Sequence, residues 1–142
     1  MARLRAAVQA ERPSALVSVA IKPDRADALT HRLQDWGAWL NDGIVDAIAP
    51  MAYTPEPARF AEQIAGARAA AGSRAVWAGI GSYRLSPEQT IDNINTARRL
   101  GAEGIVLFSY DSLINPRVSA PDYLPIVGRA AFATRRTTDG SR

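Results

Sequence analysis

Side chains suited to ligand binding and acid–base chemistry follow four short apolar runs of the 142-residue chain. Tyr53 and Tyr110 end the second and fourth runs, and Tyr83 and Arg84 come just after the third. Aromatic faces with a polar tip suit sugar rings and many other ligands. Asp111 directly follows Tyr110, where a carboxylate can act as an acid, a base or an acceptor for hydroxyl groups. These residues also have structural explanations. A tyrosine can lie at the rim of the core, and Asp111 can be the Asx residue that starts a turn.

A second kind of chemistry centres on Lys22, the only lysine of the chain, which follows the first apolar run. A lysine desolvated at the end of a strand can form a Schiff base with a carbonyl substrate, as in lyases and aldolases. Pairing with the nearby Asp24, or plain exposure to solvent, is the simpler explanation of this residue.

The apolar runs recur at a regular interval, which predicts the elements that position these side chains. They span 15–21, 45–53, 75–81 and 104–110, so that their starts are 30, 30 and 29 residues apart. An interval of about 30 residues fits one βα unit, and nearly continuous apolar strands are typical of a parallel sheet covered by helices. The ligand would then bind at the carboxyl ends of the strands.

Helical patterns fill the intervals between the runs. Leu29, Leu33, Trp36 and Leu40 predict one amphipathic helix, and Phe60, Ile64 and Ala67 predict a second. Ser86, Pro87 and Gln89 form the signature of a capping box that starts a third helix. Further helices are expected over 2–11 and about 122–133, which gives the order α-βα-βα-βα-β-α. Four parallel strands in this order form either a small open sheet or half of a barrel.

Two glycines within the third run, in Gly79-Ile80-Gly81, superficially suggest a phosphate-binding loop. No third glycine follows at the required spacing, and no acidic residue completes a dinucleotide-binding pattern. Glycines inside a strand more often allow another segment to approach closely. We therefore expect no nucleotide cofactor here, and the glycines predict close packing.

Composition excludes several classes of protein. The chain is 47% apolar and 22% charged, which is ordinary for a globular domain, and no apolar run approaches the length of a membrane-spanning helix. It has no cysteine and one histidine, so we expect no metal site and no cofactor. The net charge of +3 comes from scattered arginines, so nucleic-acid binding is not expected.

The sequence carries no recognisable export signal, and it does not identify the cellular compartment of the protein. We expect one domain over residues 1–133 and a disordered basic tail over 134–142.

Four blocks of the sequence resemble the glycosyl-hydrolase-like 10 family, in order and spacing. They are residues 34–40, with Gln34-Asp35-Trp36 and Trp39-Leu40, the run from Gly43 to Tyr53, the run from Ala78 to Tyr83, and the run from Gly104 to Leu113. The resemblance extends over about residues 3–113. It implies the last four βα units of a (β/α)8 barrel that hydrolyses O-glycosidic bonds of a polysaccharide or oligosaccharide, with residues 2–11 as the helix that follows the fourth strand.

The resemblance also implies roles for the candidate residues. Tyr53, Tyr83 and Tyr110 would contact sugar, Arg84 would clamp a hydroxyl or carboxylate, and Asp111 would be the catalytic carboxyl group. A second catalytic carboxyl group commonly comes from the fourth strand of such barrels, which the resemblance places before Met1. The expectation is thus a truncated barrel half with weak or no activity, whose partner is carbohydrate and either a missing N-terminal half or a second copy.

Two alternatives to a glycosidase half stay open. One is a Schiff-base lyase or aldolase that uses Lys22. The other is a non-catalytic half-barrel that binds sugar or serves a structural role and dimerises, because four strands leave two exposed edges.

Overall fold

A parallel sheet of four strands forms the centre of the computed structural model, which describes residues 1–115 and 120–132. The strands follow the chain in spatial order, β1-β2-β3-β4, and all neighbouring pairs are parallel. Their bounds are β1 Ser18–Ile21, β2 Ala47–Ala52, β3 Ala75–Ile80 and β4 Gly104–Leu107. The predicted α/β class with four parallel strands is confirmed. The tail expected at 134–142 lies outside the described residues.

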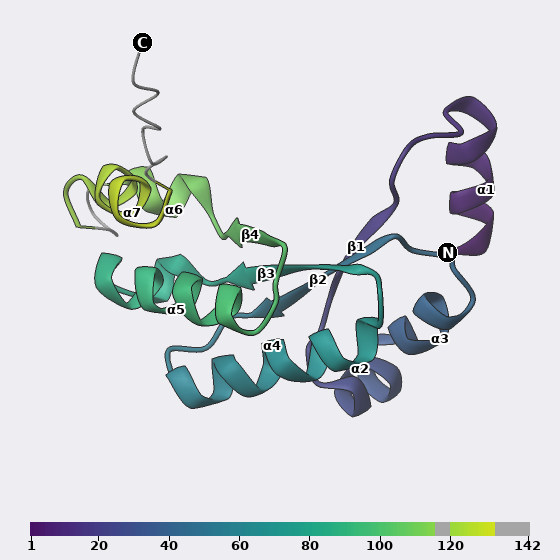
Figure 1. Cartoon of the computed structure of the whole chain (residues 1–142), viewed down its shortest axis with the longest axis horizontal. Helices are drawn as coiled ribbons and strands as arrows, with labels where there is room; N and C mark the ends of the chain where they lie inside the picture. The colour runs from purple at the N-terminus through teal and green to yellow at the C-terminus, as the bar shows by residue number, and fades with distance from the viewer. Residues whose placement is uncertain (116–119, 133–142) are drawn as a thin grey trace, which may run out of the picture.

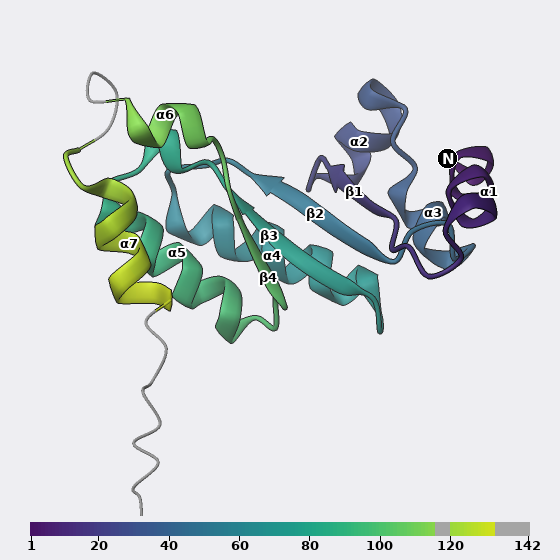
Figure 2. The same cartoon turned by 90° about the horizontal axis from the view of Figure 1, so that it is seen from above.

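Helices connect the strands and cover one face of the sheet (Figure 1). Their bounds are α1 Ala2–Glu11, α2 Arg25–Arg32, α3 Trp36–Asn41, α4 Pro57–Ala71, the 3-10 turn η1 Ser82–Arg84, α5 Pro87–Arg99, α6 Tyr110–Ile114 and α7 Tyr123–Phe132. Seen from above, α4 and α5 run alongside β2 and β3, and α7 lies beside α5 (Figure 2). Among the described helices, none combines the length and the apolar character that a membrane span requires.

The core lies between the sheet and these helices, in two clusters. One joins β3 to α4, α5 and α7 through residues such as Phe60, Ile80 and Ile94. The other joins β1 and β2 to α2 and α3 around Ile48 and Trp36. Successive side chains of a strand point to opposite faces, so alternate residues of every strand reach this core.

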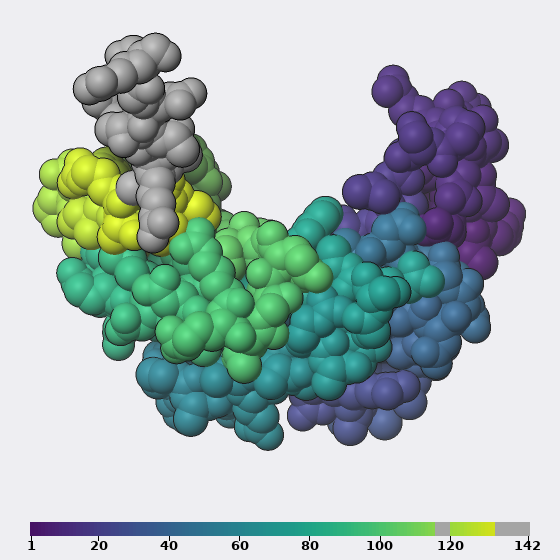
Figure 3. Space-filling model, viewed as in Figure 1, coloured from purple at the N-terminus to yellow at the C-terminus, as the bar shows by residue number. Residues whose placement is uncertain are grey.

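The opposite face of the sheet is concave and carries no covering helix. Figure 3 shows the chain as a crescent, hollow between α1 at one end and α7 at the other. Two apolar side chains in or beside the edge strands are exposed: Leu16, just before β1, is 74% exposed, and Val106 in β4 is 40% exposed. Helix α1 buries none of its own residues. The sheet therefore has one packed face, one open face and two open edges, at β1 and β4.

At the amino end of the sheet, two acidic side chains each hydrogen-bond to the backbone of a neighbouring segment. Asp46, just before β2, accepts a hydrogen bond from the Val17 backbone N–H at 2.8 Å, and its own N–H donates to Val17 O. Glu103, just before β4, makes the same reciprocal pair with Val76 of β3. An arginine from a helix, Arg5 or Arg68, completes each arrangement.

The helix predicted from the stripe Leu29–Leu40 is wrong as a single element. The chain forms two short helices instead, because Leu33 takes a left-handed conformation with φ 54° and ends α2. The side chain of Asp35 then caps α3 by accepting from the Ala38 N–H. Leu33 is 85% exposed, and only Trp36 and Leu40 of the stripe are buried.

The other predicted helices agree closely with the structure. Ser86 and Gln89 form the expected capping box at the start of α5, with Pro87 in its first turn. Phe60, Ile64 and Ala67 are buried on α4, which ends at Gly72. Local signals were reliable wherever a capping residue and an apolar stripe agreed.

Candidate functional site

Three aromatic rings meet at the carboxyl end of the sheet. Tyr53 follows β2, Tyr83 lies in η1 after β3, and Phe108 follows β4. The rings of Tyr53 and Phe108 stack at 5.2 Å with 17° between their planes. Tyr83 meets both edge-on, with its ring centroid 6.4 Å from that of Tyr53 and 6.1 Å from that of Phe108. We call these three residues the aromatic cluster.

Backbone contacts around Gly81 bring the cluster together. A Cβ atom at Gly81 would lie 2.9 Å from Tyr53 Cβ and 3.1 Å from its Cα, closer than folded proteins allow, so only glycine lets β2 and β3 end side by side here. The Tyr83 N–H donates to Phe108 O at 3.4 Å, and Arg84 Nη1 donates to Tyr53 O at 3.2 Å. The predicted close packing at this glycine is confirmed.

The cluster keeps an apolar surface available to a ligand. Phe108 is 48% and Tyr83 is 41% exposed, so part of each ring is accessible to a ligand. Burial, reinforced by the neighbouring Tyr83, raises the pKa of the Tyr53 hydroxyl above its ordinary value, so the hydroxyl stays protonated and able to donate. Sequence reasoning missed Phe108, because the apolar run 104–110 placed it inside the predicted fourth strand.

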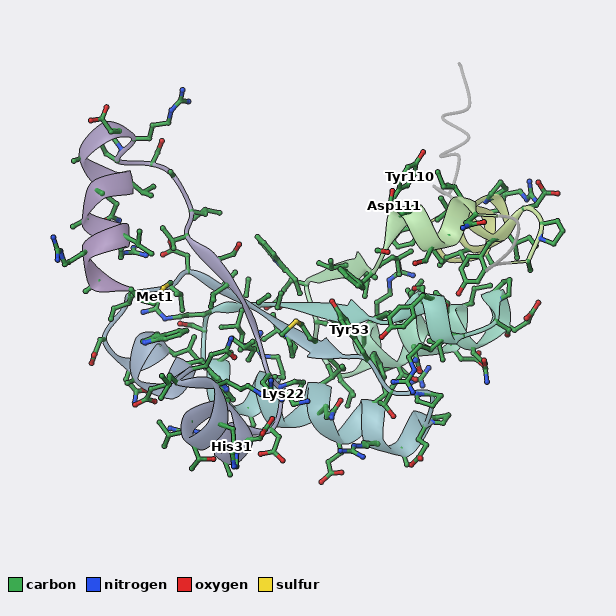
Figure 4. All side chains as sticks on the ribbon, turned by 180° about the vertical axis from the view of Figure 1, so that it is seen from behind. Met1, Lys22, His31, Tyr53, Tyr110 and Asp111 are labelled. Atoms are coloured by element: carbon green, nitrogen blue, oxygen red, sulfur yellow. The ribbon has the colours of Figure 1, made fainter. Side chains whose placement is uncertain are left out.

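Tyr110 and Asp111 lie apart from the aromatic cluster. The fourth strand ends at Leu107 rather than at Tyr110 as expected, and Tyr110 instead begins helix α6. Tyr110 is 66% exposed, and Asp111 beside it is exposed as well. Figure 4 shows both on α6, separated from Tyr53 at the end of β2. Asp111 has no hydrogen bond or ion pair among the residues that the structure describes, and a carboxylate in the first turn of a helix is favourable by itself.

Lys22 follows β1 at the same end of the sheet. Its Nζ lies 3.9 Å from Asp27 Oδ2, and its side chain is 42% exposed. Of the two simpler explanations, exposure to solvent agrees with this setting, whereas the carboxylate within ion-pair distance is that of Asp27 and Asp24 instead caps α2 by accepting from the Asp27 N–H at 2.9 Å. Solvent and Asp27 therefore both stabilise the charged amine, which is the setting of an ordinary surface lysine.

A cavity of about 670 Å³ opens beside the aromatic cluster and brings several predicted residues together. Tyr53 and Arg84 line it on one side and Lys22 on the other. Further polar side chains of the wall are Arg32, Gln34, Thr54, Glu56, Arg59 and Gln63. Tyr83, Tyr110 and Asp111 do not line it. Within residues 1–115 and 120–132, no group of three His, Asp or Glu side chains is placed to hold a metal ion.

The chain was compared with protein-family models, with curated proteins and with solved structures, and none of the three comparisons found a match.

Proposed function

We propose that this chain supplies the sugar-binding side of a glycoside-hydrolase-like cleft, acting on a polysaccharide or oligosaccharide. The observation that carries this proposal is the aromatic cluster, which lies half-exposed at the carboxyl ends of β2, β3 and β4 beside a cavity. Ligands of parallel α/β proteins bind at this end of the sheet. Stacked, partly exposed rings suit the apolar faces of sugars, and the adjoining Arg84 and Glu56 offer a donor and an acceptor for hydroxyl groups.

The same proposal includes the architecture of a (β/α)8 barrel, of which this sheet is one half. Eight strands close a barrel whose interior is filled by side chains, whereas these four leave Val106 and Leu16 exposed and both edges open. Closure takes four more parallel strands, from a second copy of the chain or from another four-stranded unit. The sequence resemblance to glycosyl-hydrolase-like 10 proteins supports this architecture.

Open edges and an apolar concave face predict that the isolated chain associates with itself. In size-exclusion chromatography with light scattering, we expect a mass above the 15.3 kDa of one chain, rising with concentration. A well-folded species that stays at 15.3 kDa at high concentration would count against the half-barrel.

Hydrolysis of a glycosidic bond takes two carboxyl groups on opposite sides of the bond. We assign one of them to Asp111 on the sequence resemblance alone; it lies in the first turn of α6, outside the cavity wall, and its side chain makes no hydrogen bond or ion pair with the described residues. The second belongs to the four strands that close the barrel. The chain by itself is therefore proposed to bind sugar with little turnover.

Binding can be tested on the aromatic cluster directly. Replacing Tyr53 with alanine removes the ring that stacks on Phe108 and also lines the cavity. We expect affinity for the best oligosaccharide of a defined panel to fall about fivefold, since stacking on an aromatic ring contributes roughly 1 kcal/mol beyond its buried area. Isothermal titration calorimetry on the full chain measures this.

The matched control is Phe132→Ala, which removes an exposed ring on α7 that contacts Arg98 rather than the cluster. Its affinity should equal that of the unchanged chain. Equal losses in both variants, or no binding of any sugar to the unchanged chain, would refute the proposal.

A further inference from the structure

The cavity beside the aromatic cluster concentrates positive charge. Its wall carries four cationic side chains, Lys22, Arg32, Arg59 and Arg84, against the single carboxylate of Glu56. The whole chain has 17 basic and 14 acidic side chains, so an excess of three in one cavity equals the excess of the entire protein. Such a local field favours an anionic ligand.

These cations come from four separate elements. Lys22 follows β1, Arg32 ends α2, Arg59 lies in the first turn of α4, and Arg84 ends η1. Residues up to 62 positions apart in the sequence thus converge on one cavity. The scatter of arginines along the chain does not reveal this convergence, because it depends on the register of the parallel strands.

Two of the four cations have a carboxylate within 4 Å among the described residues, and they share a single one. Lys22 Nζ and Arg32 Nε share one carboxylate, that of Asp27, at 3.9 and 3.8 Å. Both contacts are longer than a charge-assisted hydrogen bond. Arg84 donates only to a backbone carbonyl, that of Tyr53, and Arg59 has no hydrogen bond or ion pair among the described residues. Guanidinium groups without a carboxylate partner are suited to bidentate binding of a carboxylate or sulfate.

The cationic cavity and the aromatic cluster share Tyr53, so one ligand can reach both. A neutral sugar would use the rings and leave the guanidinium groups without a partner. A sugar unit that carries an acidic group would place its ring on the aromatic cluster and its charge among the arginines.

We propose that the cavity recognises an acidic sugar unit, with a carboxylate or sulfate group held by Arg59 and Arg32. This inference rests on the proposed function, because it names the substrate class of the same site. Recognition by charge would make the affinity depend strongly on ionic strength, because the arginine side chains of this open cavity are accessible to solvent and dissolved salt screens their charge.

The test compares an oligogalacturonide with the same oligosaccharide after its carboxyl groups have been reduced to alcohols. The two ligands share ring, linkage and length and differ only in charge. With the full chain in calorimetry, we expect the acidic form to bind at least tenfold more tightly at low salt, and the difference to shrink as salt is added. A sulfated oligosaccharide of the same length distinguishes the two anionic groups.

Variants that neutralise single arginines test which of them produce the preference for the acidic ligand. Arg59→Gln and the double variant Arg32→Gln/Arg59→Gln should remove most of the preference for the acidic ligand, lowering affinity for the acidic form much more than affinity for the reduced form. Arg129→Gln, an exposed arginine on α7, changes the net charge equally and should leave the preference intact. Circular dichroism confirms that each variant is folded.

The outcomes separate this inference from the proposed function. Equal affinity for acidic and reduced ligands overturns the acidic-sugar inference and leaves sugar binding intact. Loss of preference in Arg129→Gln as large as in Arg59→Gln also overturns it, because the effect would then be one of net charge. No binding of either ligand overturns both proposals.

Discussion

Replacing Gly81 with alanine is expected to lower the free energy of unfolding by about 2 kcal/mol and to weaken sugar binding about fivefold, as much as loss of the Tyr53 ring. The added Cβ would lie 2.9 Å from Tyr53 Cβ and 3.1 Å from Tyr53 Cα and Cγ. Because backbone atoms of Tyr53 are among the obstacles, rotation of a side chain does not relieve the overlap. The end of β2 has to move away from β3, and the ring of Tyr53 then leaves its stacking position on Phe108.

The same substitution at Gly66 is the matched control. Gly66 lies inside α4, and a Cβ there meets nothing within 4 Å. Gly66→Ala should stabilise the chain by about 0.5–1 kcal/mol, because alanine is the better helix former, and should leave binding unchanged. Chemical denaturation and calorimetry on both variants check this. Unchanged sugar affinity in folded Gly81→Ala would show that the stacking position of Tyr53 is not needed for binding.

The architecture was predictable because several independent signals agreed. The interval of about 30 residues between apolar runs anticipated four parallel strands, and the structure adds that they lie side by side in sequence order. The capping box at Ser86 and the apolar stripe of α4 anticipated two helices almost to the residue. Such signals are local, depending only on residues a few positions apart, so they can be recognised without knowing the tertiary structure.

The predicted bounds of one helix and one strand were wrong because the backbone changes conformation inside an apolar pattern. The stripe from Leu29 to Leu40 has helical spacing, yet Leu33 takes a left-handed conformation that leucine rarely adopts. Asp35 then starts a new helix. The run 104–110 continues in apolar character beyond Leu107, but the chain turns into α6 there and carries Tyr110 and Asp111 off the sheet. Apolar character alone does not mark the end of a strand.

The candidate site was predictable only in part. Tyr53, Tyr83 and Arg84 were identified from their places after apolar runs, and the structure brings them together at one edge. Phe108 and Arg59 were not identified. Phe108 joins the cluster only because β4 lies next to β3, and Arg59 faces the cavity only because α4 packs against β2. Such partners depend on long-range packing, which one sequence does not reveal.

Asp46→Asn is expected to lower the free energy of unfolding by about 2 kcal/mol at neutral pH, because it removes the ion pair with Arg5 at the amino end of the sheet. Arg5 Nη1 and Nη2 donate to the two carboxylate oxygens at 2.9 and 3.1 Å, and the Val17 N–H adds a third hydrogen bond at 2.8 Å. Both side chains of the ion pair are only 21% exposed. An asparagine amide keeps one acceptor but loses the charge and the bidentate pairing.

The effect of Asp46→Asn should depend on pH in a defined direction. The side-chain hydrogen bond from Arg5, followed by that from the Val17 N–H, lowers the pKa of Asp46 below its ordinary value of 3.8. A carboxylate whose pKa is lower in the folded state contributes its full stabilisation above the pKa of the unfolded state, and loses it as pH falls through the folded pKa. The difference in stability between the unchanged chain and Asp46→Asn should thus be constant from pH 7 to about 5 and shrink below about 4.

Asp92→Asn supplies the control for this pH dependence. Asp92 is an exposed residue of α5 without a hydrogen bond or ion pair among the described residues. Its replacement should change stability by less than about 0.5 kcal/mol. Urea denaturation of the three proteins between pH 3 and pH 7 makes the comparison. A stability loss in Asp46→Asn that persists undiminished at pH 3 would mean that the shape of the side chain, rather than its charge, holds β1 against β2, since the unchanged Asp46 is then itself increasingly protonated.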